Sequence, residues 1–363
     1  MLSKEQLRSL RRSIDEVDRQ IVRLLKRRIG LARRIGEVKR LLEMPVRDLD
    51  RERAVLEGVG KMAEAVGLRK EGARAIFREI IAACRGVQEA TRVAFLGPKG
   101  TFTEMAARSF FPPAGTEFIP CPTIRSVFRR VQTGDTPYGV VPVENTLEGS
   151  VTATLDQFLA SDLMVYGEVE LHVEQCLILA PGTSLEDVKV ILSHPQALAQ
   201  SRNYLEERLA SAELREVSST AEAVRLLSKV PHAAAIGTEL AARLYGMRVV
   251  ARGIQDSPRS YTRFFVLSEH DHPRTGRDKT SIIFSVEHVP GALYRALEVF
   301  AERGINLTKI ESRPVKRRRW EYVFFLDFEG HRHDEVCHEA LEALRRRAIL
   351  VKVLGSYPTW GSA

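Results

Sequence analysis

The first 42 residues carry an apolar repeat whose period leaves little choice of fold. Its members step alternately by three and four residues, and they are Leu7, Leu10, Ile14, Val17, Ile21, Leu24, Leu31, Ile35, Val38 and Leu42. Such spacing, sustained over this length, predicts one long helix that packs against another helix. Arg28 breaks the repeat, because it stands where the next apolar residue is due. A guanidinium in such a seam needs a partner, since burying an unpaired charge costs several kcal/mol.

Basic residues of this helix are placed to hold an anion. Arg28 and Lys39 are eleven residues apart, so they share nearly one face at a separation of roughly 16 Å along the axis. Arg11 lies about 25 Å before Arg28, and it can reach the same place only from an antiparallel partner helix. The helix offers no carboxylate at the matching seam position. We therefore expect a ligand carboxylate to pair with Arg28.

Two shorter helices are expected after a break at Pro45. One starts near residue 48 and places three polar residues on one face, at i, i+3 and i+4: Asp48, Arg51 and Glu52. The other covers roughly residues 71–89, and two of its polar residues are four apart on one face: Cys84 and Gln88. A plainer interpretation stays open, in which these side chains are solvated charges on a basic coiled coil.

The positive charge of the chain is concentrated in this helical segment. Residues 1–90 hold 22 Lys and Arg against 14 Asp and Glu, an excess that equals the net charge of +8 for the whole chain. The remaining residues are therefore neutral overall. An excess confined to one segment indicates an anionic partner there, and both nucleic acid and a small polyanion are candidates.

Several classes of protein are excluded by composition. The sequence has no run of eighteen apolar residues, so no membrane-spanning helix is expected, and its N-terminus lacks the apolar core of a signal peptide. Its four cysteines form no CxxC pair: Cys84, Cys121, Cys176 and Cys337. We expect a reduced, cytoplasmic protein with buried thiols and with neither a disulfide framework nor a metal site. With 363 residues, of which 44% are apolar, the chain can form two or three domains.

Beyond the helical segment, the sequence predicts two further domains. From Arg92 onward, short apolar runs such as "YGVVPVEN" alternate with helical stretches, which predicts an α/β domain with mostly parallel sheets and a ligand at the strand ends. After the polar stretch "HDHPRTGRDK", the order of elements is βαββαβ, a ferredoxin-like unit. The predicted fold is thus multidomain, with boundaries at residues 1–90, 91–269 and 279–357.

Several long motifs resemble known families in one fixed order. "LRRSIDEVDRQIVRLLKRR", "PVRDLDRER" and "IIAACRGVQ" resemble the all-helical chorismate mutases, which form intertwined dimers. "AFLGPKGTFTEMAA", "GVVPVENTLEGSV", "SHPQALAQSRNYL" and "SYTRFFVL" resemble the two-lobed prephenate dehydratases, and "PGALYRAL" with "ESRP" resembles ACT regulatory domains. The whole resembles the bifunctional chorismate mutase–prephenate dehydratase family of phenylalanine biosynthesis. It implies chorismate and prephenate as substrates, phenylalanine as inhibitor, a homodimer or tetramer, and no cofactor.

The resemblance gives each polar residue of the helical segment a role. Arg11 from the partner chain, Arg28 and Arg51 would bind the two substrate carboxylates, while Lys39 and Gln88 would hydrogen-bond the ether oxygen. The reaction is a rearrangement within one molecule, so the enzyme has to orient the substrate and stabilise charge on the breaking ether bond.

The same resemblance places the remaining mutase residues around the substrate ring. Asp48 and Glu52 would fix the ring hydroxyl. Cys84 stands where many relatives have serine, and because a thiol is a poorer donor we expect it to pack against the substrate rather than hydrogen-bond to it.

For the dehydratase, the resemblance implies that the hydroxyl of Thr262 contacts the leaving hydroxyl group. Glu144 and Asn145 follow a predicted strand, and a half-buried Glu144 would have a raised pKa suited to an acid. Further expected members of the pocket are Ser193, Gln196 and Gln200. Arg263 is expected to bind a carboxylate, although an arginine beside a strand end is also often structural.

Two other residues near these motifs allow alternatives. His194 precedes a proline at a strand end, where a helix cap or turn competes with a catalytic role. Ser260 replaces the asparagine that relatives usually have two residues before Thr262, which leaves preference between prephenate and its amino counterpart arogenate open. Fusion to a mutase favours prephenate.

In the last segment, the resemblance implies a phenylalanine site. Gly291 at a helix start leaves backbone N–H groups open to a carboxylate, and Glu311 could meet an ammonium group. The effector residues expected from the two motifs are Gly291, Ala292, Leu293, Glu311 and Ser312.

Two rival interpretations remain. A basic helical head joined to a ligand-binding domain would suit a transcription regulator, which would bind duplex DNA with a steep salt dependence. Against it, the head has no compact helix-turn-helix, so we expect no nucleic-acid partner. Alternatively, the helices serve only for dimerisation, which the presence of Arg28, Lys39 and Gln88 argues against.

Overall fold

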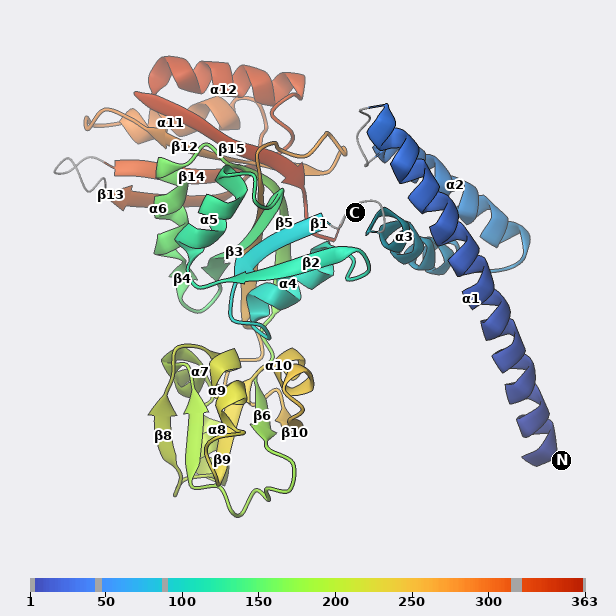
Figure 1. Ribbon diagram of the computed structural model, residues 1–363. Coiled ribbons are helices and arrows are strands. Elements are labelled where there is room, and N and C mark those ends of the chain that lie inside the picture. Colours follow the sequence, from blue (N-terminus) through green and yellow to red (C-terminus); the bar gives the residue numbers. More distant parts are fainter. Residues whose placement is uncertain (1–3, 43–47, 87–90, 315–321, 362–363) are drawn as a thin grey trace. The chain divides into compact units, whose positions relative to one another are not determined.

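The computed structural model describes residues 4–42, 48–86, 91–314 and 322–361. Its residues fall into two compact units, one of Met1–Arg92 with Phe111–Glu117 and the other of Val93–Phe110 with Phe118–Ala363. Helices make up most of the first unit, while the second contains the sheets (Figure 1).

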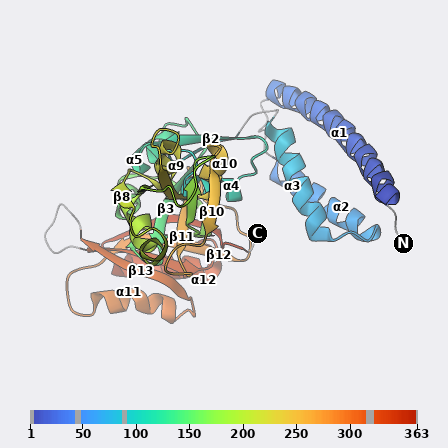
Figure 2. The ribbon, with the colours of Figure 1, turned by 90° about the horizontal axis from the view of Figure 1, so that it is seen from below.

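Three helices build the N-terminal unit: α1 (Lys4–Leu41), α2 (Leu49–Ala65) and α3 (Lys70–Gly86). α1 continues without interruption through the apolar repeat, as the absence of proline from that stretch allows. α2 begins after Asp48, whose side chain accepts a hydrogen bond from the backbone N–H of Arg51 and so caps the helix. α3 packs against both α1 and α2, and Figure 2 shows the three helices from below.

The apolar face of α1 is largely exposed in the single chain. All ten side chains of the repeat are between 48% and 64% exposed, with Ile21 and Leu24 at these two limits. Exposed apolar faces of this length mark a surface for another protein segment.

The second unit begins with a mixed sheet in the order β2-β1-β3-β11-β5, and this sheet forms the first lobe. Its strands are β1 (Thr91–Leu96), β2 (Thr116–Cys121), β3 (Tyr138–Asn145), β5 (Met164–His172) and β11 (Tyr261–Ser268), with the short β4 (Gly149–Ser150) paired to β3. Three helices accompany it: α4 (Phe102–Phe110), α5 (Ile124–Gln132) and α6 (Thr152–Ala160). β11 therefore returns to this sheet after the chain has built the second lobe.

The second lobe is a five-stranded sheet in the order β10-β6-β9-β7-β8. Its strands are β6 (Cys176–Leu179), β7 (Val190–Ser193), β8 (Glu213–Glu216), β9 (Ala233–Gly237) and β10 (Arg248–Arg252). Its helices are α7 (Pro195–Gln200), α8 (Arg202–Arg208), α9 (Thr220–Leu226) and α10 (Glu239–Leu244). The chain crosses between the lobes twice, from β5 to β6 and from β10 to β11, which gives the predicted two-lobed architecture.

The expectation of mostly parallel sheets was wrong. In the first lobe β1 and β3 are parallel, but β11 is antiparallel to both β3 and β5. In the second lobe β7 is parallel to β8 and β9, whereas β6 is antiparallel to β9 and β10. The antiparallel strands β5, β6, β10 and β11 are those next to the two crossings. Strand direction there follows the path between lobes, which local sequence does not encode.

The C-terminal segment has the predicted βαββαβ order. Its elements are β12 (Asp278–Ser285), α11 (Ala292–Ala301), β13 (Leu307–Pro314), β14 (Tyr322–Glu329), α12 (Glu335–Arg347) and β15 (Leu350–Pro358). The strands form one antiparallel sheet in the order β13-β14-β12-β15. The ferredoxin-like fold is therefore confirmed.

The first lobe and the ferredoxin-like sheet share one apolar core. A single cluster joins residues of the lobe, such as Val141 and Phe265, to Phe325 and Tyr357 of the other sheet. The rings of Phe265 and Tyr357 have centroids 5.6 Å apart. Gly355 of β15, at a φ of +146°, comes so close to β5 that an added Cβ would lie 2.4 Å from the carbonyl oxygen of Val165. Figure 1 shows the first lobe between the other two sheets.

Among the helices that the structure describes, none combines the length and the apolar character needed to span a bilayer.

Candidate active sites

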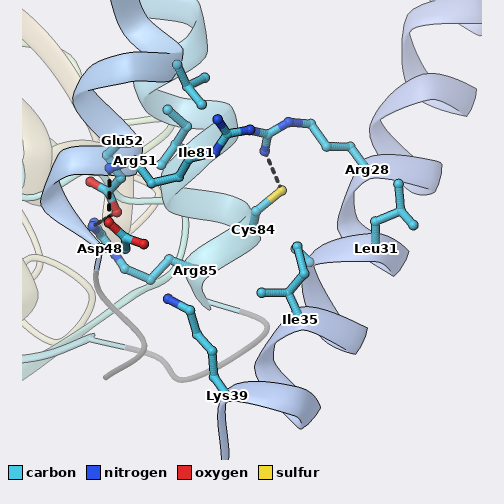
Figure 3. Close-up of a pocket in the computed structure, with 12 residues that line it drawn as sticks. Arg28, Leu31, Ile35, Lys39, Asp48, Arg51, Glu52, Ile81, Cys84 and Arg85 are labelled. Carbon is cyan, nitrogen blue, oxygen red and sulfur yellow. Dashed lines mark hydrogen bonds and ion pairs between the residues drawn. The ribbon is translucent and has the colours of Figure 1, made fainter. Parts of the chain in front are cut away.

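A cavity of about 560 Å³ lies among the three N-terminal helices. Its polar lining contains six of the eight residues expected for the mutase together with one arginine that was not expected: Arg28, Lys39, Asp48, Arg51, Glu52, Cys84 and Arg85. Apolar side chains, including Leu31, Ile35 and Ile81, complete the wall (Figure 3). One pocket thus combines cationic, acidic and apolar surface, as an anionic ring-containing ligand requires.

Arg28 points from α1 into this cavity (Figure 3). Its Nη1 lies 2.7 Å from Sγ of Cys84 and 3.4 Å from the carbonyl oxygen of Ile80. Within the described ranges the guanidinium thus contacts a thiol and a carbonyl, but it forms no ion pair with a carboxylate. The Arg28 side chain is oriented by α3, and no carboxylate of the described residues is paired with it. Cys84 is buried, and whether it packs against the substrate stays a prediction.

The acidic side of the cavity is held by the start of α2. Asp48 caps α2 through a 3.0 Å hydrogen bond from the backbone N–H of Arg51. Glu52 accepts a hydrogen bond from Arg85 at 2.9 Å, and both side chains are largely buried. Lys39 enters from the last turns of α1 and points toward these residues (Figure 3). The helical spacing in the sequence therefore brings these groups together as expected.

Two residues expected at this site lie elsewhere. Arg11 is exposed on α1 and does not line the cavity of its own chain. Gln88 lies outside the described residues. Arg85, by contrast, was missed, although it stands three residues before Gln88 in the sequence, a spacing that makes two residues neighbours on a predicted helix.

A second cavity, of about 340 Å³, lies between the two lobes. The first lobe contributes Asn145 and Thr262, and the second contributes residues around α7, Gln196 and Gln200 among them. His194 also lines the cavity and caps α7, because its Nδ1 accepts a hydrogen bond from the backbone N–H of Gln196. The cap role weighed for His194 is therefore confirmed.

Asn145 and Thr262 form a fixed pair on neighbouring strands. They are opposite each other in the β3–β11 ladder, and Nδ2 of Asn145 donates to Oγ1 of Thr262 at 2.8 Å. The Oδ1 atom of Asn145 accepts backbone N–H groups of Leu147 and Glu148, which fixes the orientation of its amide. Since Oγ1 of Thr262 accepts a hydrogen bond here, its own proton is available to donate in another direction.

Three residues expected in this cavity are held outside it. Ser193 is fully buried and donates to the carbonyl oxygen of Ile236 at 2.8 Å. Glu144 contacts Nζ of Lys309 at 2.8 Å, and Arg263 pairs with carboxylates instead of facing the cleft. Glu144 directly precedes Asn145 in the sequence, and Arg263 directly follows Thr262. Successive side chains of a strand point to opposite faces, so they face away from the cleft.

Gln175 is one of several cleft residues that were not expected from the sequence. Gln175 directly precedes β6, lines the cavity and is only 3% exposed. In the described part of the chain, its buried Oε1 has no hydrogen-bond partner, and the same holds for Nε2 of Gln200. Buried polar atoms without a protein partner are rare in native proteins, and in a cleft such atoms are open to a ligand or to water.

A third cavity, of about 360 Å³, lies at the start of α11. Ala292 and Leu293 line it together with Pro290, Tyr322 and Phe324. Gly291 adopts a left-handed φ of +78° and leaves the helix start without a side-chain cap. Glu311 and Ser312 do not line this cavity, and Glu311 instead pairs with Ser150 and with Lys309.

Sequence comparisons identify the family to which these cavities belong. The family model for chorismate mutase type II matches residues 10–89, that for prephenate dehydratase matches residues 93–272, and that for the ACT domain matches residues 280–346. The bifunctional chorismate mutase/prephenate dehydratase of Aquifex aeolicus (strain VF5) is 46% identical over 357 residues, covering 98% of this chain and 98% of the relative. The chain belongs to the bifunctional chorismate mutase/prephenate dehydratase family.

Other members of the family and one solved structure agree. A bifunctional chorismate mutase/prephenate dehydratase of Pseudomonas aeruginosa is 39% identical and covers 99% of both chains. The crystal structure of a prephenate dehydratase from Arthrobacter aurescens, in complex with L-Phe, has a TM-score of 0.69 and 38% identity, covering 74% of this chain and 90% of that chain. The predicted family is confirmed, and this chain is a bifunctional enzyme: it rearranges chorismate to prephenate and converts prephenate to phenylpyruvate.

Proposed function

We propose that the helical cavity is the mutase site, that the cleft between the lobes is the dehydratase site, and that the cavity at α11 binds phenylalanine. The observation that supports the first assignment is the cluster of cations in one pocket, with Arg28 directed into it and, among the described residues, in contact with a thiol and a carbonyl but with no carboxylate. The domain boundaries proposed with these sites are 1–90, 91–269 and 279–357.

In the mutase site, binding and charge stabilisation account for the chemistry. Arg28 and Arg51 present guanidinium groups suited to the two carboxylates of chorismate, and Lys39 presents a compact ammonium to the breaking ether oxygen. Asp48 and Glu52 accept from the ring hydroxyl. A rate gain of ~10⁶ requires about 8 kcal/mol of transition-state stabilisation, of which one preorganised donor supplies roughly 3–4 kcal/mol.

We also propose that the active assembly is a homodimer, or a tetramer built from such dimers. The exposed apolar repeat of α1 is the surface that a second copy would cover. An antiparallel partner helix would bring its Arg11 to the cavity of this chain, and Gln88 would complete the donor set at the ether oxygen. Each large apolar side chain buried in this way contributes about 1.5–3 kcal/mol.

In the dehydratase site, Thr262 carries the main role. Loss of carbon dioxide and hydroxide from prephenate, with uptake of one proton, gives phenylpyruvate, carbon dioxide and water. Because Asn145 donates to Oγ1 of Thr262, the hydroxyl proton of Thr262 is directed to the leaving hydroxyl group of the substrate. Gln196 and Gln200 would bind the remaining carboxylate from the opposite lobe.

Phenylalanine fits the third cavity by size and by chemistry. The backbone N–H groups of Gly291 and Leu293 at the start of α11 would bind its carboxylate, while the N–H of Ala292 already donates to the carbonyl oxygen of Val289; the apolar part of the lining suits its ring. The Arthrobacter aurescens relative was solved with L-Phe, which supports this ligand class. Glu311 and Ser312 lie outside this cavity in the single chain, so any contact they make with phenylalanine would involve a second copy.

A cytoplasmic location is proposed from the thiols. All four cysteines are free and buried. Burial raises the pKa of Cys176 and of Cys337 to about 11, and nearby carboxylates add to both shifts. Such neutral, enclosed thiols suit a reducing compartment.

Two variants test the site assignments in the same experiment. With chorismate as the only substrate, an NMR time course of Thr262→Ala should show prephenate accumulating, because the mutase still works and the dehydratase does not. Lys39→Ala should leave chorismate almost untouched, with a kcat lower by about 10²–10³, yet consume added prephenate at the wild-type rate. If Lys39→Ala retained most of its mutase activity, the helical cavity would not be the mutase site.

A further inference from the structure

The strand pair that carries Asn145 and Thr262 into the cleft carries two charged residues on its opposite face. The register pairs Arg263 with Glu144, one position along from the pair of Thr262 with Asn145. Neighbouring residues of a strand point to opposite faces. Asn145 and Thr262 are therefore each adjacent in the sequence to a charged residue that faces the ACT domain.

Arg263 is held almost entirely by buried groups, and two of these groups belong to the ACT domain. Its Nη1 lies 2.5 Å from Oδ2 of Asp327 on β14, and its Nη2 lies 2.9 Å from the hydroxyl of Tyr357 on β15. Its Nε lies 2.8 Å from Oε2 of Glu168 on β5. The side chain of Arg263 is 11% exposed, while those of Asp327 and Glu168 are 6% and 0% exposed.

The same cluster extends further into the ACT sheet. Lys279 of β12 contacts Oε1 of Glu168 at 2.9 Å, and the hydroxyl of Ser281 donates to Oδ1 of Asp327 at 2.6 Å. Two cations thus face two carboxylates. Buried ion pairs add little net stability to the fold. Separating any one member of the cluster, however, leaves a buried charge without its partner, so the cluster favours one arrangement of its four side chains.

Glu144 is held from the ACT domain in a similar way. Nζ of Lys309 on β13 contacts Oε2 of Glu144 at 2.8 Å and Oγ of Ser150 at 2.9 Å. The same ammonium lies 3.5 Å from Glu311, which also pairs with Ser150. The side chain of Lys309 is only 12% exposed. Charged side chains of both β3 and β11 therefore contact the ACT domain.

We propose that Arg263 and Glu144 are positioning residues, through which the ACT domain sets the placement of Thr262 and Asn145 in the cleft. Apolar packing already attaches the two sheets, so attachment alone does not require charges next to the cleft residues. A displacement of a reacting or orienting group by about 1 Å can reduce the rate about 10²-fold. A small change in the ACT sheet, transmitted by the two charged contacts, is therefore sufficient to regulate the dehydratase.

The test removes the contacts from the ACT side, away from the cleft. Asp327→Asn keeps the shape of the residue and removes its charge, and Lys309→Gln does the same for the second contact. Arg313→Gln is the matched control: Arg313 also lies on β13 and reaches Thr152 and Asp156 of α6 at 2.8 and 3.5 Å, and its contacts among the described residues include none with β3 or β11. Each variant is assayed as the full chain with prephenate, with chorismate and with phenylalanine.

Both test variants should lower the dehydratase kcat by about tenfold or more, with KM for prephenate within about threefold, because the groups that bind substrate remain. Mutase kcat should be unchanged, and Arg313→Gln should match the wild type. Wild-type kcat in correctly folded Asp327→Asn and Lys309→Gln would overturn the proposal, even if their melting temperatures fell. If Asp327→Asn does not fold, Tyr357→Phe replaces it, since it removes one neutral hydrogen bond from Arg263.

Inhibition by phenylalanine provides a second measurement, and this part of the test rests on the effector site proposed above. Calorimetry should show wild-type phenylalanine binding in both test variants, while the concentration that gives half-inhibition rises about tenfold or inhibition disappears. Inhibition that matches the wild type would count against the proposal. A wild-type enzyme that bound no phenylalanine would instead refute the effector site, and the kcat comparison would still decide the role of Arg263 and Glu144.

Discussion

The side-chain amide of Asn145 donates a hydrogen bond to the hydroxyl of Thr262, with 2.8 Å between Nδ2 and Oγ1. Two backbone N–H groups hold the other end of the amide, so the donor cannot exchange places with the acceptor. The direction of this hydrogen bond decides where the proton of Thr262 points, and the direction can be reversed by mutation.

Asn145→Asp should damage the dehydratase more than Asn145→Ala does. An aspartate would accept the proton of Thr262 and turn it away from the substrate, whereas alanine leaves that proton available. We expect kcat with prephenate to fall about tenfold for Asn145→Ala and about 10²-fold or more for Asn145→Asp. Steady-state kinetics on both variants measures this order, and mutase activity of the same samples is the control. Equal losses would contradict the proposed direction of donation.

Cys84→Asp should weaken chorismate binding. A carboxylate at this position would pair with Arg28, whose Nη1 lies 2.7 Å from Sγ in the native chain, and would compete with the substrate carboxylate. Loss of a charged hydrogen bond costs about 1.5–3 kcal/mol, so KM for chorismate should rise about 10- to 100-fold. Cys84→Ser serves as the matched control, and its KM should stay within about threefold of the wild type. An unchanged KM in Cys84→Asp would argue against Arg28 as a carboxylate ligand.

Gln175→Leu should stabilise the protein and impair the dehydratase at the same time. The substitution removes a buried oxygen that has no hydrogen-bond partner among the described residues, which is worth about 1–2 kcal/mol of unfolding free energy. If that oxygen serves the substrate, kcat/KM for prephenate should fall about tenfold. Thermal melting and prephenate kinetics on one preparation measure both effects. A stabilised variant with full activity would show that Gln175 takes no part in binding.

Ile14→Glu should separate the protein into monomers and abolish the mutase activity. Ile14 belongs to the apolar repeat of α1 and is 59% exposed in the single chain. Val22 is 64% exposed on the same helix but lies outside the repeat, so Val22→Glu is the matched control. Sedimentation velocity gives the mass of each variant, and mutase assays give the activity. A dimeric, active Ile14→Glu would place the dimer contact elsewhere.

The stability of the protein should fall between pH 9 and pH 11. Burial, reinforced by Asp334, raises the pKa of Cys337 from 9.0 to about 11, so the unfolded chain loses this thiol proton at lower pH than the folded chain does. The contribution is complete below pH 9 and is lost as the pH rises through the folded pKa. Urea unfolding of wild type and Cys337→Ala across this range measures the difference. The variant should show the shallower decline, and parallel curves would contradict the shifted pKa.

Much of the helical pocket could be predicted from the sequence because helical spacing is local. Arg28 and Lys39 fall on one face of α1 by their separation alone, and Asp48 joins them because it caps the next helix. The same rule would have identified Arg85, had it been applied to the position three residues before Gln88. Contacts from a second chain, such as that expected for Arg11, are not contained in a one-chain pattern.

The cleft was harder to predict because strand patterns do not say which face meets the ligand. Strand alternation separates Glu144 from Asn145, and Arg263 from Thr262, but both faces of this ladder are covered. Only the tertiary structure shows that the ACT sheet takes one face and the cleft takes the other. The antiparallel return of β11 depended on the same long-range information.

The shared core of the first lobe and the ACT sheet has a consequence for how this protein can be divided. Phe325 and Tyr357, together with Ile283, Val323 and Leu354 of the ACT domain, complete a core whose other members belong to the first lobe, and Gly355 admits no side chain where β15 meets β5. Cutting the chain before residue 279 would expose that core to water instead of releasing an intact catalytic fragment. The first lobe and the ACT sheet are therefore two halves of one core, so a change in the sequence of either half has to preserve the packing surface of the other.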